Sequence, residues 1–219
     1  RMHDWRHERT VKTGTDGQTS SVGVLTCADS RTPPDMIFDQ GIGSLFVVRI
    51  ARNFQNDVAV GTFEYGVAAL GVNSLMVLGH TKCGAVSAVA TGAVVHGSIP
   101  ALVDNVAPAV ERARHAHPGV EDKDIVPFAV RENVLESMAS TFRHSDGIRD
   151  LVKEGKLRVI GAVYDIDTGS VEWLGEHPEQ SALLAAPPTE AVAHGDANAA
   201  DAHAVVAPAG ASASERSAL

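Results

Sequence analysis

The chain has 219 residues, 44% of them hydrophobic, which is enough for one folded domain with a sizeable core. Its formal net charge of -9 argues against nucleic acid or an anionic membrane surface as a partner. No apolar run approaches the roughly 18 residues that a membrane-spanning helix needs, and no signal peptide is visible. We therefore expect a cytoplasmic protein, or a periplasmic one if a signal peptide preceding Arg1 has been removed.

The first half of the chain predicts an arm followed by buried strands. Residues 1–20 are polar and basic, and we expect them to lie over another part of the protein or over a partner subunit. Continuous apolar runs at residues 22–25 and 45–48 predict two strands, with a short helical segment after Pro33-Pro34 between them. Continuous rather than alternating apolarity is typical of strands buried on both faces, as in a parallel sheet.

Helical periodicity alternates with further strands in the rest of the domain. Apolar residues at helical spacing predict a helix over residues 57–70, ended by Gly71. The remaining expected helices span residues 84–89, 102–116, 128–142 and 148–154, and the remaining strands span 75–78, 157–164 and 171–174. The turn Asp167-Thr168-Gly169 predicts that the last strand pairs antiparallel with the one before it.

This pattern predicts an α/β fold. We expect a central, mostly parallel sheet of about four parallel strands plus an antiparallel edge strand, flanked by helices. From Ser181 to Leu219, 15 of 39 residues are Ala and none is aromatic, so this segment cannot bury enough apolar surface to offset its ordering entropy. The expected organisation is an N-terminal arm (1–20), an α/β domain (21–176) and an Ala-rich disordered tail (177–219).

Two short polar stretches follow two of the expected strands. One is Cys27-Ala28-Asp29-Ser30-Arg31 and the other is His80-Thr81-Lys82-Cys83. Residues at the carboxyl ends of parallel strands can converge in the crevice of an open α/β sheet. The only two cysteines of the chain lie here, and two Cys with one His form the protein ligand set of a catalytic zinc site.

A disulfide between Cys27 and Cys83 is the simpler alternative, but it leaves His80 and Asp29 without a role at these spacings. A carboxylate two residues from a thiolate is costly to desolvate unless it is paired, and Arg31 can pair with it. Beside a metal, the Asp29 carboxylate can accept a hydrogen bond from a group bound to the metal while Arg31 holds its orientation. The pair therefore favours the metal site.

Together these stretches resemble the β-class carbonic anhydrases. The matching motifs run in order along most of the chain, from about residue 5 to about residue 175: Gly17-Gln18, Cys27-Ala28-Asp29-Ser30-Arg31, Phe38-Asp39-Gln40-Gly41-Ile42-Gly43, Phe46-Val47-Val48-Arg49, Glu64-Tyr65, His80-Thr81-Lys82-Cys83-Gly84, Arg131-Glu132-Asn133 and Tyr164-Asp165-Ile166-Asp167-Thr168-Gly169.

The resemblance implies one Zn²⁺ per chain, bound by Cys27, His80 and Cys83. Asp29 is then either a fourth zinc ligand in a closed resting form or the partner of Arg31, and these two residues are the implied catalytic pair. The implied reaction is the reversible hydration of carbon dioxide to bicarbonate and a proton, carried out by a homodimer or a dimer of dimers.

The resemblance also implies a substrate pocket. Gln18 would orient the substrate at the mouth of the site, and Gly84 would offer its backbone N–H near bicarbonate. The implied lining of the carbon dioxide pocket is Phe46, Ala51 and Tyr65, with Tyr65 supplied by the facing subunit.

Two positions depart from the family pattern. Arg52 stands where the family often has Gly, and Val24 stands where members with an allosteric bicarbonate site have Trp. Arg52 leaves open a catalytically weak bicarbonate-binding module. Hydrolysis of CS2 or COS on the same fold also stays open, because these substrates are small and linear like carbon dioxide.

Overall fold

The computed structural model describes residues 4–51, 53 and 56–187. Within them the helices are α1 (Asp4–Asp16), α2 (Pro34–Ile37), α3 (Asp57–Leu70), α4 (Gly84–Ala90), α5 (Ile99–Val103), α6 (Ala107–Ala116), α7 (Val126–His144), α8 (Asp146–Lys153) and α9 (Gln180–Ala185). The strands are β1 (Val22–Thr26), β2 (Leu45–Arg49), β3 (Ser74–His80), β4 (Arg158–Tyr164) and β5 (Val171–Gly175).

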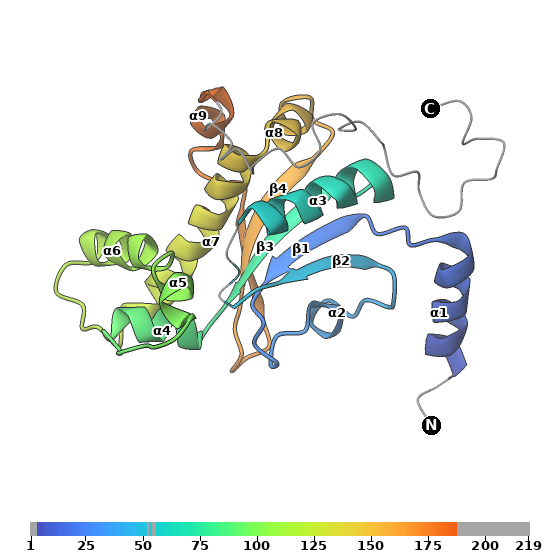
Figure 1. Ribbon diagram of the computed structural model, residues 1–219. Coiled ribbons are helices and arrows are strands. Elements are labelled where there is room, and N and C mark those ends of the chain that lie inside the picture. The colour runs from blue at the N-terminus through green and yellow to red at the C-terminus, as the bar shows by residue number, and fades with distance from the viewer. Residues whose placement is uncertain (1–3, 52, 54–55, 188–219) are drawn as a thin grey trace.

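The strands form one sheet in the order β2-β1-β3-β4-β5 (Figure 1). The first four are parallel and β5 is antiparallel to β4, which confirms the predicted fold class. Because the four parallel strands run the same way, their carboxyl ends share one edge of the sheet, here called the carboxyl edge, and their starts share the opposite, amino edge. Among the helices, α7 supplies the largest share of the core on one face, with further residues from α3, α4 and α6, while Ile37 of α2 packs on the other face.

Helix α7 packs close to the sheet because two of the strand residues beneath it are glycines. A Cβ atom on Gly79 of β3 would lie 2.7 Å from Cγ2 of Val134 of α7, and one on Gly161 of β4 would lie 2.9 Å from Cγ1 of the same residue. The parallel pairing of β3 and β4 places both glycines on the face that α7 covers. This close packing supports β3 at the point where it reaches His80.

The structure corrects the helix predicted over residues 102–116. It is two helices, α5 and α6, separated by Asp104–Val106. Pro108 lies in the first turn of α6, where its missing N–H costs no hydrogen bond, so it favours a new helix start. The apolar spacing continues across the break, but no residue of α5 is buried, and the core residues of this region are Val106, Val110 and Ala113.

The outermost strand and the two ends of the described chain show three further features. β2 is an edge strand whose Leu45–Val48 run is only half-buried, although continuous apolarity predicts burial on both faces. Helix α1 projects from the body (Figure 1), and Arg9 ties it to the 41–44 loop by donating to the Ile42 carbonyl and to Ser44 Oγ. Helix α9 packs Leu183 and Leu184 on the core, so the described structure continues past residue 176. The expected tail beyond Pro187 lies outside the described residues.

Among the described residues, no helix has both the length and the apolar character needed to cross a membrane.

Candidate metal centre

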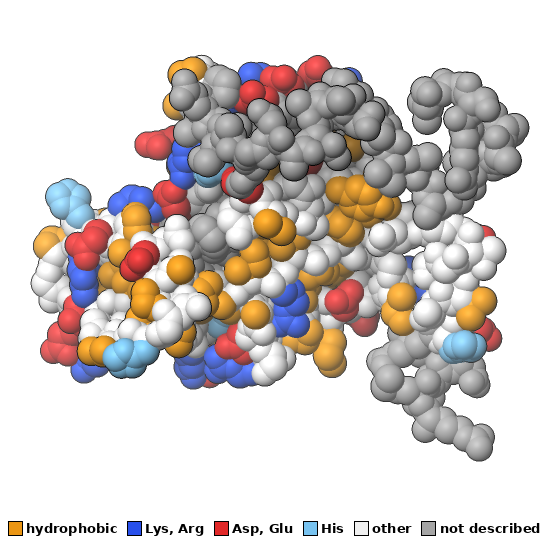
Figure 2. All heavy atoms as spheres, in the orientation of Figure 1, with side chains coloured by type: hydrophobic (Ala, Val, Ile, Leu, Met, Phe, Trp, Pro, Cys, Tyr) orange, Lys and Arg blue, Asp and Glu red, His pale blue; other side chains and the backbone are white. Residues whose placement is uncertain are grey.

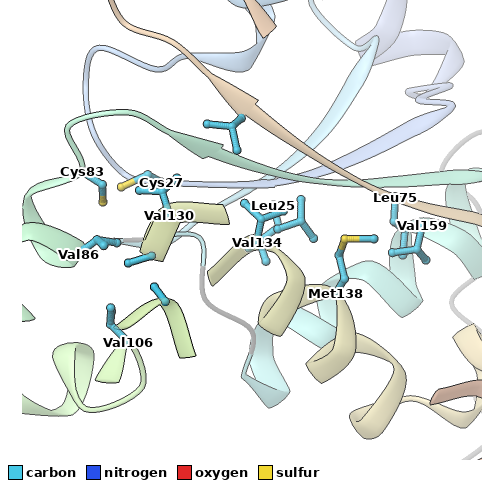
Figure 3. Packing of buried hydrophobic residues seen from close by; sticks show 14 of the residues in the cluster. Leu25, Cys27, Leu75, Cys83, Val86, Val106, Val130, Val134, Met138 and Val159 are labelled. Carbon is cyan, nitrogen blue, oxygen red and sulfur yellow. The ribbon is translucent and has the colours of Figure 1, made fainter. Parts of the chain in front are cut away.

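Three potential metal ligands meet at the carboxyl edge of the sheet. Cys27 directly follows β1, His80 ends β3 and Cys83 precedes α4. Their ligand atoms all lie within 4.8 Å of one another, and all three side chains are buried. Figure 3 shows Cys27 and Cys83 together at one end of the buried cluster, beside Val86. The structure therefore brings together the three residues that the sequence singles out.

The imidazole of His80 is oriented for metal binding. Its Nδ1 lies 2.8 Å from the carbonyl oxygen of Thr81, which places the proton on Nδ1 and leaves the Nε2 lone pair facing the cluster. Nε2 is buried and has no hydrogen-bond partner of normal geometry within the described part of the chain. Burial lowers the pKa of His80, but the neighbouring Cys27 and the Thr81 carbonyl outweigh it and raise the pKa overall.

The thiol of Cys83 has a pKa well above its ordinary value, because it interacts with Cys27 and is buried. The backbone N–H groups of Val86 and Ala85, in the first turn of α4, act in the opposite direction and stabilise a thiolate. A bound divalent cation would reverse the balance, since a coordinating thiol is deprotonated. Two sulfurs and one ring nitrogen within 4.8 Å fit the donor set of zinc.

Asp29 and Arg31 form a two-pronged ion pair next to this cluster. Nε of Arg31 donates to Oδ1 of Asp29 at 2.9 Å and Nη2 donates to Oδ2 at 2.6 Å. The backbone N–H of Arg31 also donates to Oδ1. These bonds to Arg31 hold the pKa of Asp29 well below its usual range, although partial burial opposes them. The carboxylate is therefore ionised, and its Oδ2 lies 4.0 Å from Nε2 of His80.

Of the predicted pocket residues, Ala51 and Gly84 lie at the same edge as the cluster. The backbone N–H of Ala28 donates to the carbonyl of Ile50, which places the following residue, Ala51, beside the Cys27 stretch. Gly84 directly follows Cys83 and is exposed. Arg52 lies outside the described residues.

The other predicted pocket residues lie toward the amino edge. Phe46 pairs with Gly23 in the sheet, four residues before Cys27, a separation of roughly 13 Å along the strand. Tyr65 contacts Phe46, with ring centroids 6.2 Å apart. Gln18 precedes β1 and lines a cleft of about 800 Å³ between α1 and α3 that Tyr65 also lines. A single chain thus keeps Gln18, Phe46 and Tyr65 away from its own metal ligands.

Arg49 forms hydrogen bonds with backbone carbonyls of the Cys27 stretch, and the sequence alone did not predict this contact. Its Nε donates to the carbonyl of Cys27 at 3.0 Å, and its Nη2 donates to the carbonyl of Asp29 at 2.5 Å. A charged residue ending an apolar strand is the sequence signal that could have pointed to it.

Comparison with known proteins decides the family. The family model described as carbonic anhydrase matches residues 22–171. The chain belongs to the carbonic anhydrase family. Carbonic anhydrase 2 of Mycobacterium tuberculosis is 37% identical over 158 residues, covering 70% of this chain and 73% of the relative. The carbonic anhydrase of Mycolicibacterium smegmatis is 34% identical and covers 72% of this chain and 76% of the relative.

Solved structures place this carbonic anhydrase in the β class. The β-carbonic anhydrase CafA of Aspergillus fumigatus superposes with a TM-score of 0.74 at 25% identity, covering 85% of this chain and 91% of that one. The Coccomyxa β-carbonic anhydrase, solved in complex with acetazolamide, gives 0.66 at 27% identity and covers 78% of this chain and 81% of that one. The sequence resemblance to β-class carbonic anhydrases is therefore confirmed.

Proposed function

We propose that this carbonic anhydrase hydrates carbon dioxide reversibly with one zinc ion held by Cys27, His80 and Cys83. The observation that carries the proposal is the convergence of three buried ligand atoms within 4.8 Å, beside an ionised carboxylate. Zinc, when bound, would act as a Lewis acid that makes water nucleophilic near neutral pH. His80 and the two thiolates supply three ligands and leave a fourth position open.

The side chains around the ligands divide the remaining work. Asp29 accepts a hydrogen bond at the open position, which its Oδ2 can reach because it lies 4.0 Å from Nε2 of His80. Arg31 keeps that carboxylate ionised and holds it in place through the two-pronged pair. We assign the N–H of Gly84 to bicarbonate and the small side chain of Ala51 to the carbon dioxide pocket.

The structure also supports a site completed by a second chain, and we propose a homodimer or a dimer of dimers. Phe46 pairs with Gly23, four residues before Cys27, and Gln18 and Tyr65 line the cleft between α1 and α3. The β2 edge strand carries a half-buried apolar run, and Tyr65 is 42% exposed. Figure 2 shows apolar side chains reaching the surface over α3 on this face. A partner would cover this surface and place these residues at its own metal centre.

The test of the zinc assignment is metal analysis combined with stopped-flow carbon dioxide hydration. Cys83→Ser should lose most of its zinc and its activity. Thr91→Ser, at the other end of α4, is the matched control and should keep both. Full zinc retention in Cys83→Ser would contradict the assignment, and faster turnover of carbon disulfide than of carbon dioxide would favour the hydrolase alternative.

The test of the shared site is a mixed dimer. One chain carries Gln18→Ala and Tyr65→Ala and keeps its metal ligands, while the other carries only Cys83→Ser. Purified by two different tags, the mixed dimer would contain one intact site if the two edges come from different chains. We expect it to be active although both parent homodimers are not. A mixed dimer as inactive as its parents would place the whole site in one chain.

A further inference from the structure

Arg49 lies at the end of β2, next to the end of β1. The two strands are paired there, with Arg49 opposite Thr26, and the ladder continues through bonds from Ile50 N–H to the Thr26 carbonyl and from Ala28 N–H to the Ile50 carbonyl. Beyond this point the Cys27 stretch leaves the sheet. The guanidinium of Arg49 follows it and donates to the carbonyls of Cys27 and Asp29.

The Asp29 carbonyl is the centre of a tight turn. It accepts hydrogen bonds from the backbone N–H of Thr32 at 3.1 Å, from Oγ1 of Thr32 at 3.0 Å and from Nη2 of Arg49 at 2.5 Å. Thr32 is fully buried, so this turn is fixed on its inner side by Thr32 and on its outer side by Arg49. The orientation of this peptide sets where the Asp29 side chain leaves the backbone.

A second guanidinium connects the two stretches that carry the metal ligands. Nη2 of Arg31, which pairs with the Asp29 carboxylate, also donates to the carbonyl of Lys82 at 3.2 Å. Lys82 lies between His80 and Cys83 and has a positive φ of 56°, an uncommon backbone conformation for a residue with a side chain. Arg49 therefore holds one stretch to the sheet, and Arg31 holds it to the other stretch.

We propose that Arg49 is a positioning residue for the metal centre, an inference that rests on the proposed zinc function. By donating to both carbonyls, it fixes the Cys27–Asp29 backbone, so that the Cys27 sulfur meets His80 and Cys83 while the Asp29 carboxylate stays on Arg31. The planar fork of arginine donates along two directions at once. Lysine keeps the positive charge but has a single nitrogen on a flexible stem. Comparing arginine with lysine at position 49 therefore distinguishes the effect of hydrogen-bond geometry from the effect of charge.

The variants Arg49→Gln and Arg49→Lys test this role, with Arg158→Gln as the matched control. Arg158 is an exposed arginine at the start of β4, on the opposite edge of the sheet, and its ion-pair partner Glu176 is 3.9 Å away. Zinc affinity is measured by competition with a chromogenic chelator. The absorption spectrum of the cobalt-substituted protein reports the ligand geometry without any turnover. Thermal unfolding of the metal-free variants reports the fold separately.

We expect Arg49→Gln to bind zinc about 10- to 100-fold more weakly, as is typical when a residue supporting metal ligands is lost. Its cobalt spectrum should change, and kcat should fall more than KM rises, because the carbon dioxide pocket is not altered. Arg49→Lys should fall between Arg49→Gln and the wild type, and it carries the comparison if Arg49→Gln does not fold. Arg158→Gln should match the wild type.

Two results would overturn the inference. In the first, both Arg49 variants keep the zinc affinity and cobalt spectrum of the wild type. In the second, Arg49→Lys recovers both completely, which would show that only the charge matters. A wild-type chain that binds no zinc would overturn the proposed function, and the inference with it.

Discussion

Replacing Gly79 by alanine tests how closely the sheet and α7 are packed behind the metal centre. The new methyl group would lie 2.7 Å from Cγ2 of Val134 and 3.2 Å from Cγ1 of Val130, where ordinary van der Waals contact begins at 3.4 Å. Figure 3 shows Val134 among the buried side chains that α7 turns toward the sheet. Val134 is completely buried and β-branched, so its side chain cannot turn away easily and α7 must move.

Overpacking of this kind costs about 1–3 kcal/mol of unfolding free energy. For a domain of this size, each kcal/mol lowers Tm by about 2–4 °C, so Gly79→Ala should lower Tm by about 2–12 °C. Because His80 is the next residue, zinc affinity should fall as well. The control is Gly61→Ala in α3, where nothing lies within 4 Å of the added methyl group. There the same substitution should stabilise the protein by about 0.5–1 kcal/mol, since Gly is unfavourable inside a helix.

The double variant Gly79→Ala/Val134→Ala identifies the cause. Val134→Ala removes the obstructing methyl groups, so adding a methyl at Gly79 should cost much less in that background, with a coupling of about 0.5–3 kcal/mol. Thermal unfolding is compared at one chain concentration, because assembly makes Tm concentration-dependent. An unchanged Tm for Gly79→Ala, or an equal loss in both backgrounds, would refute the packing argument.

Four further predictions follow from single contacts or segments. Burial lowers the pKa of His177, so its contribution to stability is lost as pH falls below 6.5, and His177→Gln should flatten that part of a Tm-against-pH curve. Ser145→Ala should cost about 0.5–2 kcal/mol in chemical denaturation, because Ser145 Oγ caps α8 by accepting from Ile148 N–H. Asp29→Ala should keep most zinc in metal analysis but lose most hydration activity, since three ligands remain; near wild-type rates would contradict its catalytic role. Truncation after Pro187 should leave Tm and activity unchanged, and a large fall in Tm would show that the removed residues pack on the domain.

The strands and the metal cluster could be predicted from the sequence because they depend on short-range patterns. Apolar runs bounded by polar residues mark β1 and β3, and parallel strands bring the residues after them to one edge. The break between α5 and α6 was missed because the apolar residues keep helical spacing across it. Pro108, inside the predicted span of residues 102–116, was the signal for the break, because a proline is tolerated in the first turn of a helix but not in its interior. Helix α9 was missed because six residues carry too little periodicity to stand out from an Ala-rich segment.

The apolar run of β2 is less buried in a single chain than its sequence predicts. Leu45–Val48 predicts a strand buried on both faces, yet in one chain it is a half-buried edge strand. A partly exposed apolar run of four residues on an edge strand is unfavourable in water and favours association with another chain. The apolarity of a strand reflects how deeply it is buried in the assembled protein, not only in one chain. The apolar run of β2 is therefore explained if the proposed partner chain covers it.

The same reasoning applies to the substrate pocket. Gln18 precedes β1 and Cys27 follows it, so a five-residue strand of roughly 16 Å separates the two edges on which they lie. Strand polarity alone therefore prevents one chain from bringing Gln18 to its own Cys27, whatever the side-chain conformations. Tyr65 has the same constraint, because α3 returns from the carboxyl edge toward the amino edge and carries Tyr65 to the ring of Phe46. If Gln18 and Tyr65 act on carbon dioxide, the metal that they serve must belong to another copy of the chain.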